Sequence, residues 1–297
     1  MKNREKLTGC LFALFTVIAW GSTFISSKVL LAHYTPSQIM LIRFLLAYGV
    51  LWLLKPQRLH LPLHQEAGFL LLGLAGCSIY FYTENSALTY TLASNVSIIV
   101  AAAPMFTAIL AHFAKVERLR RSTLQGFLIA FAGVVLVVCN GTFVLKLHPR
   151  GDLLALAAGA CWAAYSVLQR KVACNIPPLL MTRRTLFWGI VTAIPLVILE
   201  DAAFSFAPLL LPPVWGNFLF LGLIGSALCY VLWNNAFRLL GVVTTNSFIY
   251  LQPFVTIVAA RLILAEPISP LAFLGAVLIT IGMIAAQRTP KTKPSSR

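Results

Sequence analysis

Apolar runs of about 20 residues recur along this chain, and no other feature constrains its fold as strongly. A helix needs about 20 predominantly apolar residues to cross the hydrocarbon core of a bilayer. Ten segments meet this requirement: 7–27, 36–54, 67–88, 94–114, 122–139, 153–169, 179–199, 215–237, 243–264 and 270–287. The sequence therefore predicts an all-α membrane protein with ten transmembrane helices.

Composition supports the same conclusion. Of the 297 residues, 59% are apolar and 10% are charged, whereas in soluble domains about half are apolar and roughly a quarter are charged. The formal net charge is +15, but the basic residues form short clusters between the apolar runs. A nucleic-acid-binding protein would present them on one water-exposed face. The lipid bilayer is therefore the expected partner, and nucleic acid is not.

The basic clusters predict how the chain is oriented, because lysine and arginine resist translocation. If the N-terminus is cytoplasmic, the cytoplasmic segments hold 16 of the 23 lysines and arginines, including a basic tail at 288–297. We therefore expect a multi-pass protein of the inner or plasma membrane with both termini in the cytoplasm.

The chain also matches itself. Residue types that are scarce in this chain occur in the first half and again 149 positions later in the second. The pairs are Asn85 and Asn234, Pro104 and Pro253, and Glu117 and Glu266. Trp20 matches Trp162 at a spacing of 142, and Arg43 matches Arg184 at 141. Each repeat has five spans, an odd number, so the second copy must enter the membrane from the opposite side. This predicts two inverted five-helix repeats, 7–140 and 151–287, the architecture of many secondary transporters.

The Trp20-Gly-Ser-Thr-Phe run and the Pro104…Glu117…Gly126…Gly133 pattern that closes each half resemble the EamA family of the drug/metabolite transporter superfamily. The resemblance covers about 8–140 and 151–287, and implies export of amino acids or varied metabolites without a cofactor. Glu117 and Glu266 resemble that family's end-of-helix glutamates, and we expect each to cap the following helix.

Several residues are candidates for the transport site. Pro104 and Pro253 lie mid-span at matching positions, and such interruptions point to a transporter's binding site, although a simple packing kink would look the same. Glu84 is the one acid well inside a predicted span, where an ionisable group is costly and by default functional. It either binds a cationic or amino group of the solute or carries a coupling proton; the alternatives are a structural pair, for which Arg43 lies at a suitable depth, and a carboxylate that reaches the membrane interface. Arg43 and Arg184 are the other buried charges, and we expect each to meet a carboxylate, a helix C-terminus or an anionic solute.

Aromatic and amide side chains complete the expected lining of a solute cavity, which is typically apolar with few polar anchors. Interfacial aromatic belts and hydrogen bonds between helices are the alternatives. The predicted substrate-binding residues are Trp20, Tyr80, Glu84, Asn85, Trp162, Tyr165, Tyr230, Asn234, Asn246 and Gln252.

Other classes find less support. The sequence contains no His-Glu-x-x-His, Gly-x-Ser-x-Gly or phosphate-binding Gly-x-x-x-x-Gly-Lys motif, so we expect no enzyme, metal site or cofactor. A lipid or lipid-linked solute flippase and a non-transporting scaffold or receptor stay open. So do the energy source (a proton, exchange or the solute gradient) and the choice between monomer and homodimer. The residues favour a carrier that exports a small organic solute by alternating access.

Overall fold

The computed structural model describes residues 2–114, 149–172, 176–267 and 270–287, with isolated positions between 125 and 136. All regular secondary structure in these residues is helical, which confirms an all-α protein. The elements are α1 (Lys2–Leu30), α2 (Pro36–Leu54), α3 (Leu63–Gly73), η1 (Leu74–Ile79), α4 (Tyr80–Tyr90), α5 (Ala93–Val100), α6 (Ala103–Phe113), α8 (Pro149–Val172), α9 (Pro178–Glu200), η2 (Ala207–Leu210), α10 (Pro212–Leu219), η3 (Phe220–Leu228), α11 (Cys229–Leu240), α12 (Val242–Asn246), η4 (Ser247–Leu251), α13 (Gln252–Ile263) and α14 (Pro270–Gln287).

Within the described residues, eight helical segments are long and apolar enough to cross a membrane. They are Asn3–Leu30, Pro36–Leu54, Leu63–Tyr90, Ala93–Phe113, Pro149–Val172, Pro178–Glu200, Pro212–Leu240 and Thr244–Ile263. Each coincides with a predicted span. The predicted span 270–287 is α14, whose apolar part is the shorter helix Phe273–Gly282, and 122–139 falls largely outside the described residues. The chain is a multi-pass membrane protein, and the total of ten spans remains a prediction.

Two of these spans are interrupted by π-helix at matching positions. η1 lies between α3 and α4, and η3 lies between α10 and α11. Residues 74–79 of η1 correspond, 149 positions later, to 223–228, which lie within η3. π-helical turns are rare and occur frequently at functional sites. The two halves of the chain therefore share a local backbone distortion as well as sequence.

The spans that contain the matched prolines are also broken. Ala101 and Ala102 form a turn between α5 and α6, and Pro104 lies in the first turn of α6. In the second half, the 3₁₀ segment η4 precedes α13, and Pro253 lies in its first turn. Proline fits a first helical turn because its missing N–H has no partner to lose there. The predicted interruptions thus end two residues before each proline, at Ala102 and at Leu251.

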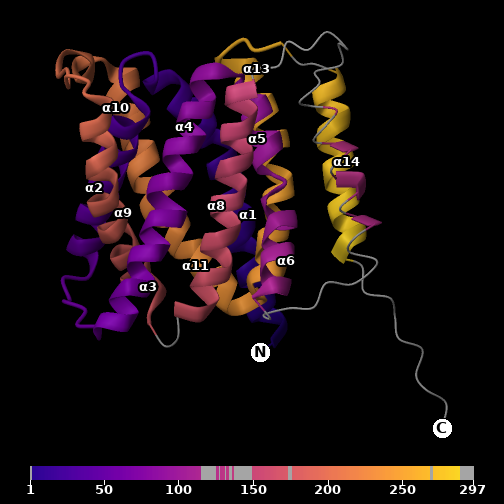
Figure 1. The fold of residues 1–297 in the computed structure, drawn as a ribbon, viewed down its shortest axis with the longest axis horizontal. Coiled ribbons are helices and arrows are strands. Elements are labelled where there is room, and N and C mark those ends of the chain that lie inside the picture. Colours follow the sequence, from indigo (N-terminus) through magenta and orange to yellow (C-terminus); the bar gives the residue numbers. More distant parts are fainter. Residues whose placement is uncertain are drawn as a thin grey trace.

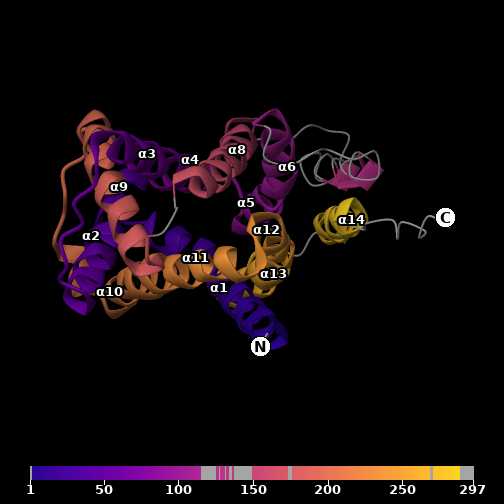
Figure 2. The same ribbon diagram turned by 90° about the horizontal axis from the view of Figure 1, so that it is seen from below.

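The matching spans run in opposite directions. In Figure 1, α3 lies below α4 within the span 63–90, whereas α10 lies above α11 within the span 212–240. Seen along the bundle in Figure 2, α2, α3, α9 and α10 form one group and α5, α6, α12 and α13 another, with α1, α4, α8 and α11 between them. The elements that carry most candidate site residues therefore lie in the middle of the bundle.

Two glycines let helices of the two halves approach closely: Gly73 packs against α9, and Gly222 packs against α2. A Cβ on Gly73 would lie 2.6 Å from the backbone nitrogen of Gly189 and 2.7 Å from Trp188 Cβ on α9. Its repeat mate Gly222 faces α2, where a Cβ would lie 2.7 Å from Leu46 Cβ. Small residues commonly serve membrane helices in this way, because they let backbones pack closely. Each half thus packs a glycine of one span against the arginine-bearing helix of the other half.

Candidate functional site

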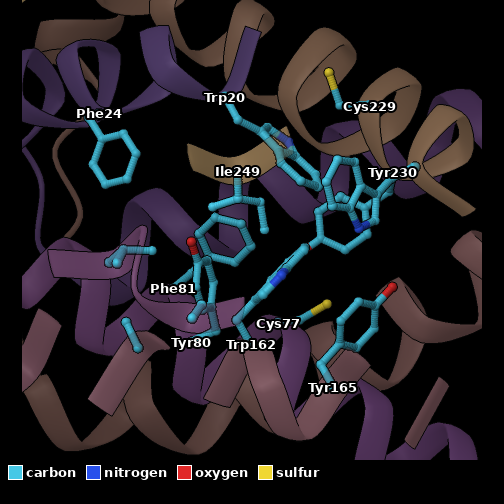
Figure 3. Close-up of a cluster of buried hydrophobic side chains, with 14 of the residues drawn as sticks. Trp20, Phe24, Cys77, Tyr80, Phe81, Trp162, Tyr165, Cys229, Tyr230 and Ile249 are labelled. Atoms are coloured by element: carbon cyan, nitrogen blue, oxygen red, sulfur yellow. The ribbon is translucent and has the colours of Figure 1, made fainter. Parts of the chain in front are cut away.

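Six aromatic side chains meet at the centre of the bundle, on α1, α4, α8 and α11. They are Trp20, Tyr80, Trp162, Tyr165, Tyr230 and Trp233, all buried. The Trp20 ring centroid lies 5.1 Å from that of Trp162 and 4.9 Å from that of Trp233. Figure 3 shows the labelled members of this cluster turned toward one another from opposite sides. The repeat mates Trp20 and Trp162 thus meet edge to face at the interface of the two halves.

The π-helical segments are tied to this cluster by hydrogen bonds. Trp20 Nε1 donates to the carbonyl of Gly225 in η3 at 2.9 Å, and Tyr230 Oη donates to the carbonyl of Gly76 in η1 at 2.8 Å. Gly76 and Gly225 are repeat mates, so each distorted span supplies one carbonyl acceptor to an aromatic side chain. Trp162 Nε1 instead donates to Asn246 Oδ1 at 3.2 Å. Buried indole and phenol groups need such partners, and these bonds fix the orientation of the rings.

A cavity adjoins the cluster. Its lining comes from both halves of the chain: Trp20, Thr23, Tyr80, Phe81, Glu84, Val100, Ala103, Trp162, Tyr230, Ile249 and Gln252. Its volume is about 20 Å³, which is enough for about one water molecule. The site is therefore closed in this conformation, and an organic solute can enter only if the surrounding side chains move apart.

Glu84 is the acidic residue of this lining. Its side chain is buried, with 2% of the residue exposed, and accepts a hydrogen bond from Tyr80 Oη at 2.5 Å. Tyr80 precedes it by four residues, so both groups lie on one face of α4. No ion pair joins Glu84 to Arg43 within 4.0 Å. The structural pairing considered from the sequence is thus absent in this conformation.

Arg43 lies behind Phe81 rather than in the cavity wall. Its Nε donates to Ser226 Oγ at 2.8 Å, and its guanidinium carbon lies 4.1 Å from the centroid of the Phe81 ring. The residue is completely buried, and neither Nη1 nor Nη2 has a hydrogen-bond partner in the part of the chain that the structure describes. Glu84 is near enough to interact with it electrostatically.

Arg184, its repeat mate, has a carboxylate partner. It forms an ion pair with Glu66 of α3, in which Nε lies 2.9 Å from Oε2, and Trp188 Nε1 donates to the same oxygen at 2.8 Å. The guanidinium also lies 4.7 Å from the centroid of the Phe187 ring. This arrangement satisfies both charges, as a structural pair would.

Six of the ten predicted binding residues line the cavity, and four lie elsewhere. Asn85 donates to the carbonyl of Pro36 at 3.3 Å, and Asn234 donates to Thr182 Oγ1 at 2.7 Å and accepts from Gln169. Asn246 holds Trp162 from behind, and Tyr165 packs on Tyr230. These four residues lie outside the cavity lining. The three asparagines form hydrogen bonds between helices, which was the alternative to solute binding.

Five lining residues were not predicted: Thr23, Phe81, Val100, Ala103 and Ile249. For one of them the sequence held a signal, because Phe81 is the repeat mate of the predicted Tyr230 at a spacing of 149. The others are small or aliphatic side chains in an apolar chain and carry no distinguishing pattern.

Glu266 caps a helix of the first half. Its carboxylate accepts from the backbone N–H groups of Ala93 and Ser94 at 2.9 and 3.3 Å, at the start of α5. The reason is spatial: α13 packs beside α5, and its end reaches the start of that helix. Positions 268 and 269, just before α14, lie outside the described residues, so the capping of that helix stays a prediction. Glu117 lies outside the described residues. No group of three or more histidines, cysteines or acids in the described part of the chain could hold a metal ion.

The comparisons with known proteins agree with this geometry. The EamA-like transporter family matches the chain twice, over residues 7–139 and 149–286. A protein built from two such units, with a closed cavity between its halves, is a transporter of this class, and the chain belongs to the EamA-like transporter family.

Its relatives carry names of the same kind. The chain is 29% identical to the uncharacterised transporter YyaM of Bacillus subtilis, covering 94% of this chain and 93% of that one. It is 26% identical to a probable terminal-alkyne amino-acid exporter of Streptantibioticus cattleyicolor, covering 95% of each. It is also 26% identical to a probable amino-acid metabolite efflux pump of Escherichia coli, covering 91% and 92%. All three are named as transporters, which agrees with the prediction that the chain is not an enzyme.

A solved structure matches the fold as a whole. One crystal structure aligns with a TM-score of 0.70 at 18% identity, covering 95% of this chain and 98% of that chain. At this identity the likeness concerns the fold alone.

Proposed function

We propose that this protein exports an amino acid or a closely related metabolite across the inner or plasma membrane by alternating access. In this proposal, 7–140 and 151–287 are inverted five-helix repeats, 288–297 is a cytoplasmic tail, and α1 begins on the cytoplasmic side. The observation that carries the proposal is a closed, aromatic-walled cavity that both halves line and that contains one buried carboxylate, Glu84.

The chemistry of the cavity supports an amphipathic solute with an amino group. Aromatic walls bind apolar side chains and also attract cations over their faces. A buried carboxylate is stabilised by a cationic partner, and Glu84 has only the Tyr80 hydroxyl as its hydrogen-bond partner among the described residues. Two relatives whose names refer to amino acids, both of which align over more than nine-tenths of this chain, support the same solute class.

The backbone supports a mechanism in which the cavity opens to alternate sides. The helix breaks before Pro104 and Pro253 border the cavity, and the π-helical turns η1 and η3 are hydrogen-bonded to its lining residues Tyr230 and Trp20. Such positions absorb backbone rearrangement more easily than regular helix. With a cavity of about 20 Å³, the present conformation is too contracted to hold an organic solute, so the cycle requires the two halves to move apart.

The test is transport by the full-length protein in proteoliposomes, with a panel of amino acids and related metabolites, with and without a pH gradient. We expect saturable movement of at least one amino acid by the wild type. Glu84→Gln should reduce it about tenfold or more. Glu200→Gln is the matched control, because Glu200 is only partly buried, bonds to Ser37 and does not line the cavity.

The outcomes separate the two roles of Glu84. If uptake depends on a proton gradient and Glu84→Gln abolishes that dependence, Glu84 carries the coupling proton. If uptake is independent of pH and Glu84→Gln raises KM, Glu84 binds the amino group. Full transport with unchanged pH dependence in Glu84→Gln would contradict both roles. Lipid scrambling without movement of any solute would instead identify a flippase. If neither lipid nor solute moved, the protein would be a scaffold or receptor.

A further inference from the structure

Arg43 has an unusual environment for a charged residue in a membrane protein. It is completely buried, and among the described residues its one hydrogen bond is from Nε to Ser226 Oγ, while Nη1 and Nη2 have no partner. An ionised group at such depth normally pairs with an opposite charge or with several acceptors. No carboxylate of a described residue lies within 4.0 Å of it. Buried polar groups left without partners are rare enough that each needs an explanation.

The guanidinium lies one layer of side chains behind the cavity. Phe81, whose ring covers it at 4.1 Å, is itself a lining residue. On another side, a Cβ at Gly225 would lie 3.2 Å from Arg43 Nη2 and 3.0 Å from Cγ2 of Thr23, which also lines the cavity. The missing side chain at Gly225 therefore makes room for the guanidinium next to the cavity wall.

We infer that Arg43 is the carboxylate-binding subsite of the solute cavity and that Phe81 covers it in the closed conformation. The two free Nη groups offer the planar fork that binds a carboxylate through two parallel hydrogen bonds. When the Phe81 ring turns aside, the cavity presents a cation and, from Glu84, an anion. An α-amino acid carries the complementary pair of charges. This inference rests on the proposed function and assigns each end of the solute to a residue.

Both charges are left incomplete by the protein itself. Glu84 accepts from a tyrosine and faces no ion-pair partner, while Arg43 donates one of its five N–H groups. If they were a structural pair, their mutual ion pair would satisfy both, as Glu66 satisfies Arg184. Because they do not pair with each other, a zwitterion that enters the opened cavity can complete each of them, with its carbon skeleton against the aromatic wall.

The experiment compares an amino acid with the amine formed by removing its carboxyl group, such as phenylalanine and phenethylamine, in proteoliposomes with the full chain. If phenylalanine is not carried, the amino acid that the transport panel identifies is used with its own amine. The wild type should prefer the amino acid. In Arg43→Met we expect the ratio of kcat/KM for amino acid to that for amine to fall about tenfold or more. Arg43→Lys keeps the charge without the fork, and should lower the ratio several-fold. Arg184→Met is the control and should leave the ratio unchanged.

The second arm tests the cover. Phe81→Ala exposes the guanidinium to the cavity, so the ratio should rise above that of the wild type. A ratio that stays the same or falls in Phe81→Ala would contradict the covering role of Phe81.

The remaining outcomes are also decisive. Size-exclusion profiles identify variants that fail to fold. If Arg43→Met does not fold, the ratio measured with Arg43→Lys tests whether Arg43 binds the carboxylate. A folded Arg43→Met or Arg43→Lys with the wild-type ratio would overturn the subsite. If the wild type carries amino acids but does not distinguish them from amines, the subsite fails and the proposed function survives. If it carries no amino acid at all, the proposed function fails and this inference fails with it.

Discussion

Arg43 and Arg184 occupy equivalent places in the two halves of the chain and have opposite surroundings. They are 141 residues apart, on α2 and α9, and each of these helices receives the matched glycine of the other half, Gly222 or Gly73. Arg184 is partly exposed and pairs with Glu66, whereas Arg43 is fully buried and has no carboxylate within 4.0 Å.

The difference comes from one acid. Glu66 lies in the first turn of α3, and the position 149 residues later holds Trp215. Glu84 likewise corresponds to Trp233. Both acids of the span 63–90 therefore have aromatic counterparts in the span 212–240. The span 212–240 thus offers no carboxylate to Arg43, which packs against it. The two arginines thus lie at equivalent places, but the spans that face them differ. As a result, Arg184 has a carboxylate partner and Arg43 has none among the described residues.

The largest effect that can test this comparison concerns stability. Arg184→Met leaves the carboxylate of Glu66, whose side chain is 14% exposed, with Trp188 as its remaining donor. We expect the free energy of unfolding in detergent to fall by about 2 kcal/mol, below the range for a completely buried pair because Arg184 is partly exposed. Denaturant unfolding followed by tryptophan fluorescence measures it.

Arg43→Met provides the matched comparison in the same assay. It removes one hydrogen bond but also removes two unsatisfied buried donors, so the loss should stay below about 1 kcal/mol. A larger loss in Arg43→Met than in Arg184→Met would reverse the assignment of structural and functional roles. A cycle with Glu66→Gln should give a coupling of about 1–2 kcal/mol for the Arg184 pair.

The sequence predicted much of this arrangement, and the limits have physical causes. Run lengths located all eight long spans because hydrocarbon thickness fixes how many apolar residues a span needs. Matching prolines located the helix breaks because proline acts on its own backbone. Sequence distance could not show which side chains cross between halves, so it predicted neither the contact of Glu266 with α5 nor the place of Phe81 in the cavity wall.

Spacing along one helix was also insufficient for Arg43 and Glu84. The sequence allowed a pair, but whether two side chains on different helices meet depends on how α2 and α4 pack, which spacing along the chain does not show. Tyr80 and Glu84, which share one helix at a spacing of four, are by contrast bonded as their spacing permits.

An intermediate effect is expected for the second donor to Glu66. Trp188→Phe keeps an aromatic ring near Arg184, but replaces the indole with a smaller phenyl group and removes the N–H that donates to Oε2. Because Arg184 still satisfies the carboxylate, the free energy of unfolding should fall by about 1 kcal/mol, measured as above. Trp215→Phe is a control of the same type, at the partly exposed position equivalent to Glu66. Equal losses in both variants would show that the bond to Glu66 contributes nothing.

The smallest effect belongs to the one hydrogen bond that Arg43 makes. Ser226→Ala removes the acceptor of Nε and leaves the guanidinium held only by the Phe81 ring and the surrounding packing. The buried arginine then has no side-chain acceptor among the described residues. Because the ring still restrains it, the free energy of unfolding should fall by about 1 kcal/mol, the low end of the range for a buried donor left without a partner. The guanidinium becomes less well oriented for two parallel bonds, and the preference for an amino acid over its amine should fall about two- to threefold. Ser78→Ala is the control, because it also removes a buried serine hydroxyl, one that donates to the carbonyl of Gly189 instead. A fall in stability without a change in that preference would mean that Ser226 serves only to satisfy a structural arginine, and Arg43 would then resemble Arg184 after all.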